Sequence, residues 1–141
     1  MKLPIFVFIL VLFFAQPGCL DVSTPVIKKA VPDGIRLGEE FFLSLNKEIT
    51  IIGEDLTIKF LSIPEDSRCP INVVCVWEGN AHIIVLLNKI DTLDLNTSLT
   101  PKEVVYKNIY KISLIEVQPY PISEQPIPIE NYKVKLKVEK V

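Results

Sequence analysis

The stretch YKVKLKVE, residues 132–139, decides the fold class of this 141-residue chain. Apolar and charged side chains alternate along it with the two-residue period of a β-strand. A helix over the same residues would spread the lysines around its whole circumference. The stretch therefore predicts a strand with one buried and one solvated face. The apolar face holds Tyr132, Val134, Leu136 and Val138, and the charged face holds Lys133, Lys135, Lys137 and Glu139.

The three lysines of the charged face allow two interpretations. They can form an anion-binding stripe, or they can be a solvated face that also discourages edge-to-edge aggregation of the sheet. We favour the solvated face, because charged side chains on the open side of a strand need no ligand to explain them.

The two-residue period recurs toward the N-terminus, over residues 41–45, 56–60 and 110–114. Residues 80–90 are apolar at both parities, which is typical of a central strand that is buried on both faces or whose outer face is covered. Residues 118–130 hold four prolines and predict an extended connection, because proline cannot donate to a central ladder. We find no helical stripe. We therefore expect an all-β fold, an antiparallel β-sandwich of immunoglobulin-like size with six to eight strands.

A charged start and a short apolar run open the chain, with Lys2 followed by the mostly apolar residues 3–15. The run is shorter than the roughly 20 residues that a membrane-spanning helix needs, and it matches a secretory signal. Gly18-Cys19 matches the small residue and lipidated cysteine at the end of a bacterial lipoprotein signal. We therefore predict that Cys19 carries lipid. The alternatives are an uncleaved signal anchor and a free thiol at Cys19.

The N-terminal pattern divides the chain into three expected parts. Residues 1–18 are a signal peptide, residues 19–34 are the lipidated cysteine and a tether, and residues 35–141 are the β-sandwich domain. We expect an exported protein of the bacterial cell envelope, anchored to a membrane through lipid on Cys19. Without its signal the chain has fourteen basic and seventeen acidic residues, a net charge of −3. That charge gives no electrostatic case for nucleic acid as a partner.

The two remaining cysteines, Cys69 and Cys75, are six residues apart. In an exported protein they predict a disulfide, which here closes a small loop and contributes about 2.4 kcal/mol by the loop-entropy relation. A redox pair is less favoured, since thioredoxin-like chemistry uses Cys-x-x-Cys at the start of a helix. A metal pair is less favoured too, since zinc takes four ligands and the chain has one histidine. We expect no metal and no cofactor.

Several side chains near the disulfide invite a functional interpretation. Trp77 lies two residues past Cys75 and so on the same face if a strand has begun there. We interpret it as a core residue packed over the disulfide, with an exposed platform for a sugar or peptide as the alternative. We interpret Asp66 and Arg68 as a structural clamp of the loop, with an anion site centred on Arg68 as the alternative. Tyr120 lies between two prolines and either covers the end of the sandwich or contacts a ligand. The candidate binding surface is Arg68, Trp77 and Tyr120.

The sequence offers no catalytic residue. His82, the single histidine, lies on an apolar strand and is interpreted as a satisfied or surface histidine. We find no G-x-S-x-G, no H-E-x-x-H and no glycine-rich phosphate loop, and no set of residues suited to a Ser/His/Asp triad. The chain is therefore not expected to be an enzyme.

Residues 66–81, DSRCPINVVCVWEGNA, resemble a signature found in an uncharacterised family of small bacterial lipoproteins and secreted proteins, D-S-R-C-P…C-x-W-x-G-x-A. The resemblance extends from about residue 41 to the C-terminus. It implies a lipid-anchored β domain, and it brings no activity that can be carried over to a residue. The match is made by Asp66, Ser67, Arg68, Cys69, Pro70, Cys75, Trp77, Gly79 and Ala81.

Three functions remain open at this point. The first is a lipid-anchored binding or structural module whose partner is an envelope protein or a glycan. The second is a small thiol-redox or metal-handling protein that uses Cys69, Cys75 and His82. The third is a protease-inhibitor-like module that presents the disulfide loop, which requires residues 71–74 to be exposed.

Overall fold

The computed structural model describes residues 34–141, which form nine strands and one turn of 3-10 helix, Ile129–Asn131. The predicted signal peptide, Cys19 and nearly all of the predicted tether lie outside the described residues. The nine strands are β1 (Gly34–Ile35), β2 (Glu40–Ser44), β3 (Glu48–Ile51), β4 (Thr57–Asp66), β5 (Ala81–Leu87), β6 (Asp91–Asn96), β7 (Glu103–Tyr106), β8 (Tyr110–Gln118) and β9 (Lys133–Lys140).

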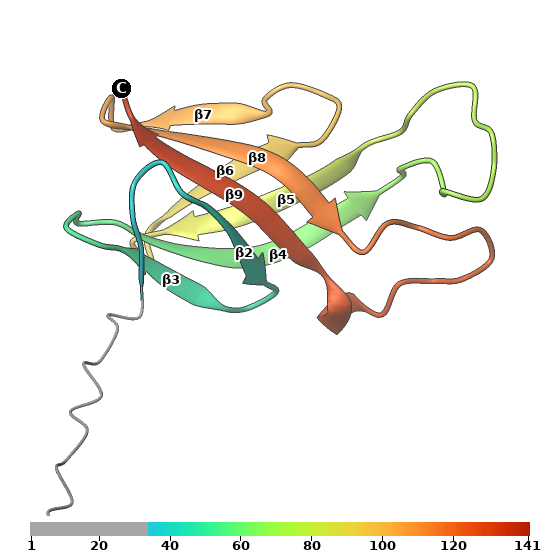
Figure 1. Ribbon diagram of the computed structural model, residues 1–141, viewed down its shortest axis with the longest axis horizontal. Coiled ribbons are helices and arrows are strands. Elements are labelled where there is room, and N and C mark those ends of the chain that lie inside the picture. The colour runs from blue at the N-terminus through green and yellow to red at the C-terminus, as the bar shows by residue number, and fades with distance from the viewer. Residues whose placement is uncertain (1–33) are drawn as a thin grey trace, which may run out of the picture. The chain divides into compact units, whose positions relative to one another are not determined.

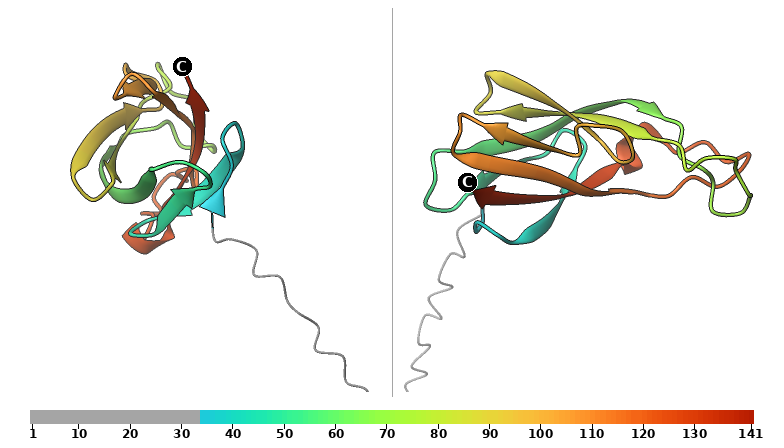
Figure 2. Two further views of the ribbon diagram at one scale, coloured as in Figure 1. Left: turned by 90° about the vertical axis from the view of Figure 1, so that its left-hand side faces the viewer. Right: turned by 90° about the horizontal axis from the view of Figure 1, so that it is seen from above.

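The strands form two sheets that pack against each other as two layers (Figure 1, Figure 2). One sheet has the order β1-β3-β4-β5-β6 and the other has the order β2-β9-β8-β7. All neighbouring strands are antiparallel except β1 and β3. The predicted all-β antiparallel sandwich is therefore confirmed. The two-residue β1 is too short to show a period in the sequence, and it adds a ninth strand to the expected six to eight.

The strand that decided the fold class, β9, buries the predicted face. Val134, Leu136 and Val138 are buried in the core between the sheets. The expectation that its lysines protect a sheet edge is wrong, because β9 lies between β2 and β8. On the outer face Lys135 forms an ion pair with Glu40 of β2 at 2.6 Å between nitrogen and oxygen. Lys137 forms an ion pair with Glu139 of its own strand, at 2.7 Å, and Lys133 lies over the ring of Phe42. Of these three lysines, only Lys135 therefore forms a cross-strand charge pair.

The five-stranded sheet buries its inner face equally well. Along β5 every second residue is fully buried, and the residues between them, His82, Ile84 and Leu86, are half-buried. The apolar character of both parities thus reflects a strand with a partly covered outer face. The buried core of both sheets is apolar: Phe41, Leu43, Ile51, Leu56, Ile58, Phe60, Ala81, Ile83, Val85, Leu87, Leu95, Tyr106, Tyr110, Ile112, Leu114, Val117, Tyr132, Val134, Leu136 and Val138.

The connections at the two ends of the sandwich differ in length. Residues 67–80 join β4 to β5, and residues 119–132 join β8 to β9; we call the end that carries these two long connections the loop end. The second connection contains no strand, but it is not extended throughout, because it forms an isolated antiparallel bridge, Ile122–Gln125, and the 3-10 turn. In residues 34–141 we find no helix that is both long and apolar enough to span a membrane.

The described chain begins at the opposite end from the loop end. In the strand register, Gly34 of β1 is paired with Thr50 of β3. Thr50 is in turn paired with Thr57, the first residue of β4. From Thr57, β4 runs ten residues to Asp66, which is about 30 Å at a rise of about 3.3 Å per residue. Figure 1 and the right-hand view of Figure 2 show the same separation between the start of the coloured ribbon and the long connections.

Candidate functional site

A buried ion pair closes the base of the disulfide loop. Arg68 is 6% exposed, and its Nε and Nη2 atoms donate to the two carboxylate oxygens of Asp66 at 2.8 and 2.7 Å. The same guanidinium donates to the backbone oxygens of Val117 and Pro119, on the other sheet and the second long connection. Tyr132 donates its hydroxyl to Asp66 at 2.9 Å. These contacts are those of the structural clamp favoured by the sequence, extended across both sheets.

The electrostatics of the clamp follow from its burial. Burial by itself raises the pKa of the Asp66 carboxyl, but the hydrogen bonds and charge of Arg68 outweigh burial, so that the pKa lies below its usual value. Burial and the hydrogen bond to Asp66 raise the pKa of the Tyr132 phenol to about 12. The stable state of the clamp is therefore an ionised carboxylate, a guanidinium and a neutral phenol. An anion centred on Arg68 is disfavoured, since most of its donors are committed to Asp66 and to carbonyls.

The loop leaves the sheets through a narrow neck that continues the β4–β5 pairing. Ser67 donates its backbone N–H to the oxygen of Asn80 at 2.7 Å, and Cys69 donates to the oxygen of Glu78 at 2.8 Å. Gly79 lies in this neck with a φ of +73°. A Cβ atom there would be 1.9 Å from the carbonyl oxygen of Ser67, so no other residue fits. This close approach explains the glycine in the signature.

Asn80, which the sequence analysis did not single out, organises the neighbouring turn. It is 2% exposed, and its Oδ1 accepts hydrogen bonds from the backbone N–H groups of Ser98 and Leu99 at 3.1 and 3.3 Å. Its Nδ2 donates to Oδ1 of Asn96 at 2.8 Å. A polar residue directly before a strongly apolar strand is the signal that could have identified it.

The loop itself is an exposed, stapled, apolar segment. Cys69 and Cys75 form the predicted disulfide, with their Cα atoms 5.9 Å apart. Trp77 is 58% exposed, so its interpretation as a core residue over the disulfide is wrong. Strand β5 begins only at Ala81, and so the strand parity that placed Trp77 inward does not apply to residues 75–79.

Both long connections contribute to this exposed surface, because they are joined by hydrogen bonds. Ile71 donates its backbone N–H to the oxygen of Pro121 at 3.0 Å, and Asn72 accepts from the backbone N–H of Ser123 at 2.8 Å. Val74 and Val76 lie beside these contacts along the chain and are fully exposed. We define the apolar tip as Ile71, Val73, Val74, Val76, Trp77 and Ile122, each at least 39% exposed.

The two long connections and the strand ends next to them are acidic. Residues 65–81 and 116–131 together hold six acidic residues and one basic residue, the clamped Arg68, a net charge of −5. The rest of residues 34–141 holds eleven basic and nine acidic residues, a net charge of +2. The next lysine along the chain, Lys133, lies against the ring of Phe42 on the outer face of the other sheet, 5.2 Å from its centroid. The loop end is thus apolar at its tip and negatively charged around it.

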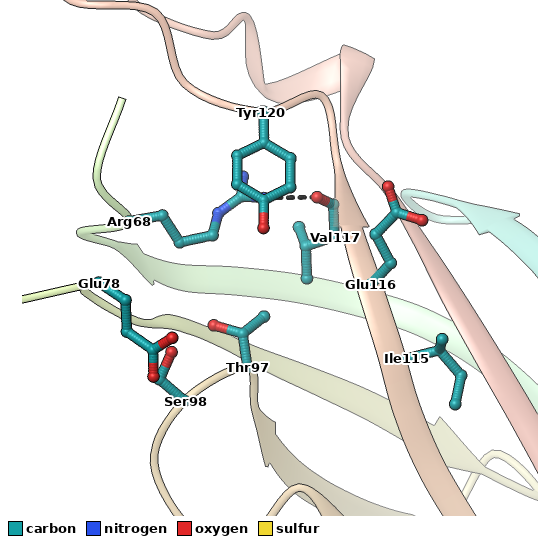
Figure 3. Close-up of a pocket in the computed structure, with 8 residues that line it drawn as sticks. All are labelled: Arg68, Glu78, Thr97, Ser98, Ile115, Glu116, Val117 and Tyr120. Carbon is teal, nitrogen blue, oxygen red and sulfur yellow. Dashed lines mark hydrogen bonds between the residues drawn. The ribbon is translucent and has the colours of Figure 1, made fainter. Parts of the chain in front are cut away.

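A hollow of about 150 Å³ lies behind the tip (Figure 3). Arg68 and Tyr120 form one side of it, and Glu78, Thr97 and Ser98 form the other, while Val117 closes the side toward β8. The Arg68 guanidinium carbon is 4.9 Å from the centroid of the Tyr120 ring, so the ring is held in place by the clamp. Tyr120 is 51% exposed and also lines a second, more apolar hollow of about 160 Å³ formed by the proline-rich connection.

The structure brings Arg68 and Tyr120 of the candidate binding surface into contact and leaves Trp77 on the exposed loop. Arg68 is buried under Tyr120, and Trp77 is exposed on the stapled loop. His82 is away from these contacts, on the outer face of β5, where its Nε2 is 2.6 Å from Oδ1 of Asp94 on β6. Within residues 34–141, no group of three or more histidine, cysteine and carboxylate side chains is arranged to hold a metal ion.

No protein-family model, no curated protein and no solved structure matches this chain.

Proposed function

We propose that this protein is a lipid-anchored binding module of the bacterial cell envelope, which binds a partner protein through the apolar tip. The observation that carries the proposal is the set of six exposed apolar side chains on two connections that are hydrogen-bonded to each other and stapled by a disulfide. A contiguous exposed apolar patch on an ordered surface is typical of an interaction site. The lipid anchor is supported by the apolar leader, by Gly18-Cys19 and by the resemblance to small bacterial lipoproteins.

The charge around the tip favours a protein over a lipid surface as the partner. The two loop segments carry a net charge of −5, and an anionic bilayer would repel them. The described chain also begins at the end of the sandwich opposite the tip, about 30 Å away along β4. A tether at that end leaves the tip free to face away from the anchoring membrane. The complementary partner is a protein with an apolar groove and a basic rim.

Site-specific photo-crosslinking in the native envelope tests this proposal. A photoreactive residue at Val74, on the tip, is compared with one at Ile90, which is 80% exposed in the turn at the opposite end. We expect one saturable protein adduct from position 74, none from position 90, and loss of the adduct in a Trp77→Ser variant. Equal labelling from both positions, or adducts with lipid alone, would contradict the proposal.

A protease-inhibitor-like function is the second candidate, because the required exposure of residues 71–74 is present. Ile71 is 67% exposed and Val74 is fully exposed. However, Val73 donates its backbone N–H to the oxygen of Pro70, so this part of the loop is a turn and does not offer the extended backbone that an enzyme cleft can pair with. Incubation with a peptidase of each mechanistic class distinguishes the two candidates, since only the second predicts saturable inhibition of one class.

A further inference from the structure

We propose that the hollow between Arg68, Tyr120, Glu78 and Ser98 is a binding site for a single six-membered sugar ring, either neutral or carrying an amino group. The residues of this site are not those of the apolar tip. Its ligand is small and polar, whereas the partner of the tip presents an apolar surface. The proposal therefore does not depend on the proposed function, although both would make the loop end the recognition surface of the protein.

The size of the hollow fits one ring. Its volume is about 150 Å³, and a cavity of about this volume accepts one benzene molecule, so a six-membered ring can enter while some of its hydroxyl groups stay in solvent. The walls come from four segments of the chain: the disulfide loop, the turn after β6, the end of β8 and the proline-rich connection. The convergence of four segments on one small hollow is typical of a ligand site.

Three polar side chains around the hollow are available to a ligand. Among the residues that the structure describes, the Glu78 carboxylate, the Ser98 hydroxyl and the Tyr120 hydroxyl form no hydrogen bond with another group. A carboxylate accepts two hydrogen bonds, and each hydroxyl both donates and accepts. A polyol offers the same mixture of donors and acceptors, so all three groups can be satisfied by one ring.

The apolar part of the lining suits the other face of a sugar. Ile115 is 45% exposed and borders the hollow on the side of β8, whereas Val117 beside it is fully buried. A pyranose ring presents C–H groups on its faces and hydroxyl groups at its edge, and it can therefore pack against the side chain of Ile115 while its hydroxyls reach Glu78 and Ser98. The Tyr120 ring adds an aromatic wall, and its hydroxyl group can hydrogen-bond a ligand at the edge of the hollow.

The walls are held in place before any ligand arrives. Arg68 is fixed by Asp66 and by two carbonyl oxygens, and it in turn lies against Tyr120. Asn80 fixes the turn that carries Ser98 through a hydrogen bond to the backbone N–H of Ser98. Ordering these groups therefore adds little cost when a ligand binds.

Charge narrows the class of sugar. Because Arg68 is neutralised by Asp66, the field in the hollow comes from Glu78 and Glu116, in a loop end with a net charge of −5. Glu116 already accepts a hydrogen bond from Gln118, whereas Glu78 is free to face a ligand ammonium or hydroxyl. Acidic sugars and sugar phosphates are therefore rejected, and amino sugars are favoured over neutral ones.

The test uses the purified full chain and saturation-transfer NMR with five probes: glucose, glucosamine, N-acetylglucosamine, glucuronic acid and ethanolamine. We expect saturable binding of the neutral and amino sugars with Kd values on the order of millimolar, glucosamine being the tightest, and no binding of glucuronic acid. Saturable binding of glucuronic acid would overturn the proposal, as would the absence of saturable binding for all three sugars. Ethanolamine as tight as glucosamine would also overturn it, since the site would then recognise only an ammonium group.

Matched variants locate the site. We expect Glu78→Gln to weaken glucosamine binding by at least about ten-fold, since the ligand ammonium then meets a neutral amide oxygen and loses its charge pair. Glu124→Gln removes the same charge from the loop end at a residue that does not line the hollow, and it should change the Kd less than two-fold. Trp77→Ser, on the apolar tip, should leave sugar binding unchanged while it abolishes crosslinking at the tip. Equal effects of the two glutamate variants would place the ligand elsewhere and overturn the proposal.

Discussion

Replacing Arg68 by Met is expected to destabilise the fold severely, although Arg68 lies outside the apolar core. The substitution removes two charged hydrogen bonds to Asp66 and leaves the carbonyl oxygens of Val117 and Pro119 without that donor. The Asp66 carboxylate stays buried with only Tyr132 as a side-chain partner. Removing one member of a buried ion pair costs about 3–5 kcal/mol, because the remaining charge is left uncompensated.

The expected loss is large compared with the total stability. A domain of this size has a free energy of unfolding of about 5–15 kcal/mol. A loss of about 4 kcal/mol, with a urea dependence of about 2 kcal/mol per molar, lowers the urea midpoint by about 2 M. Equilibrium unfolding in urea, followed by circular dichroism, measures this shift. Arg36→Met is the matched control, since Arg36 is the other arginine of the chain and is exposed, and it should change stability by less than about 0.5 kcal/mol.

The pH dependence separates the lost ion pair from lost packing. In the unaltered protein Arg68 holds the pKa of Asp66 below its usual value, so the stability from this carboxylate is present above about pH 4 and is lost as the pH falls through the folded-state pKa. In the variant the hydrogen bonds from Tyr132 and from the backbone N–H of residue 68 remain, but the charge and hydrogen bonds of the guanidinium are lost. Burial is then opposed less strongly, which raises the pKa of Asp66 above its value in the unaltered protein and makes the ionised carboxylate less favourable near pH 7. The difference between the two proteins should therefore shrink as the pH falls toward 3.

Two results would refute this reasoning. One is a loss of less than about 1 kcal/mol at pH 7, and the other is a loss that stays the same down to pH 3. As a further check, we expect the double variant Asp66→Asn/Arg68→Met to cost less than the sum of the two single variants, because it leaves no buried charge.

Three other predictions follow from the loop and the leader. Gly79→Ala should prevent or severely weaken folding, since the added Cβ would overlap the backbone of Ser67. Gly38 has a similar positive φ but open space around it, so Gly38→Ala should lower the free energy of unfolding by only about 1 kcal/mol, as measured by thermal unfolding. Removing the disulfide with Cys69→Ser/Cys75→Ser should lower the free energy of unfolding by about 2 kcal/mol in urea and leave the sheet spectrum unchanged; a larger loss would mean that the bond holds the fold itself. Cys19→Ser should move the protein from the membrane fraction to the soluble fraction, and a variant that stays with the membrane would disprove lipidation.

The sandwich was predictable because its strands obey a local rule. The alternation of apolar and polar side chains along β9, and over residues 41–45, 56–60 and 110–114, involves neighbouring residues, and burial of one strand face produces it. The order of the strands was not predictable in the same way, because it depends on which distant segments pair. The lysines of β9 illustrate the difference: their solvent-facing side could be read from the sequence, but their position in the interior of a sheet could not.

The candidate site shows the same division between local and long-range information. The disulfide and the Asp66–Arg68 pair join residues that are close in sequence, and both were predicted. The contacts of Arg68 with Val117, Pro119 and Tyr120 span about fifty residues and have no local signal. Trp77 was misplaced because strand parity was extended past the true start of β5, into a loop that has no strand period.

The exposure of Trp77 means that its intrinsic fluorescence can report binding at the loop. It is the single tryptophan of the chain, and because it already meets water in the folded state, its emission should change little when the sandwich unfolds. A partner that covers the loop would instead shift that emission to shorter wavelength and shield it from a soluble quencher. The same side chain that is nearly silent in a denaturation experiment can therefore report docking without any attached dye.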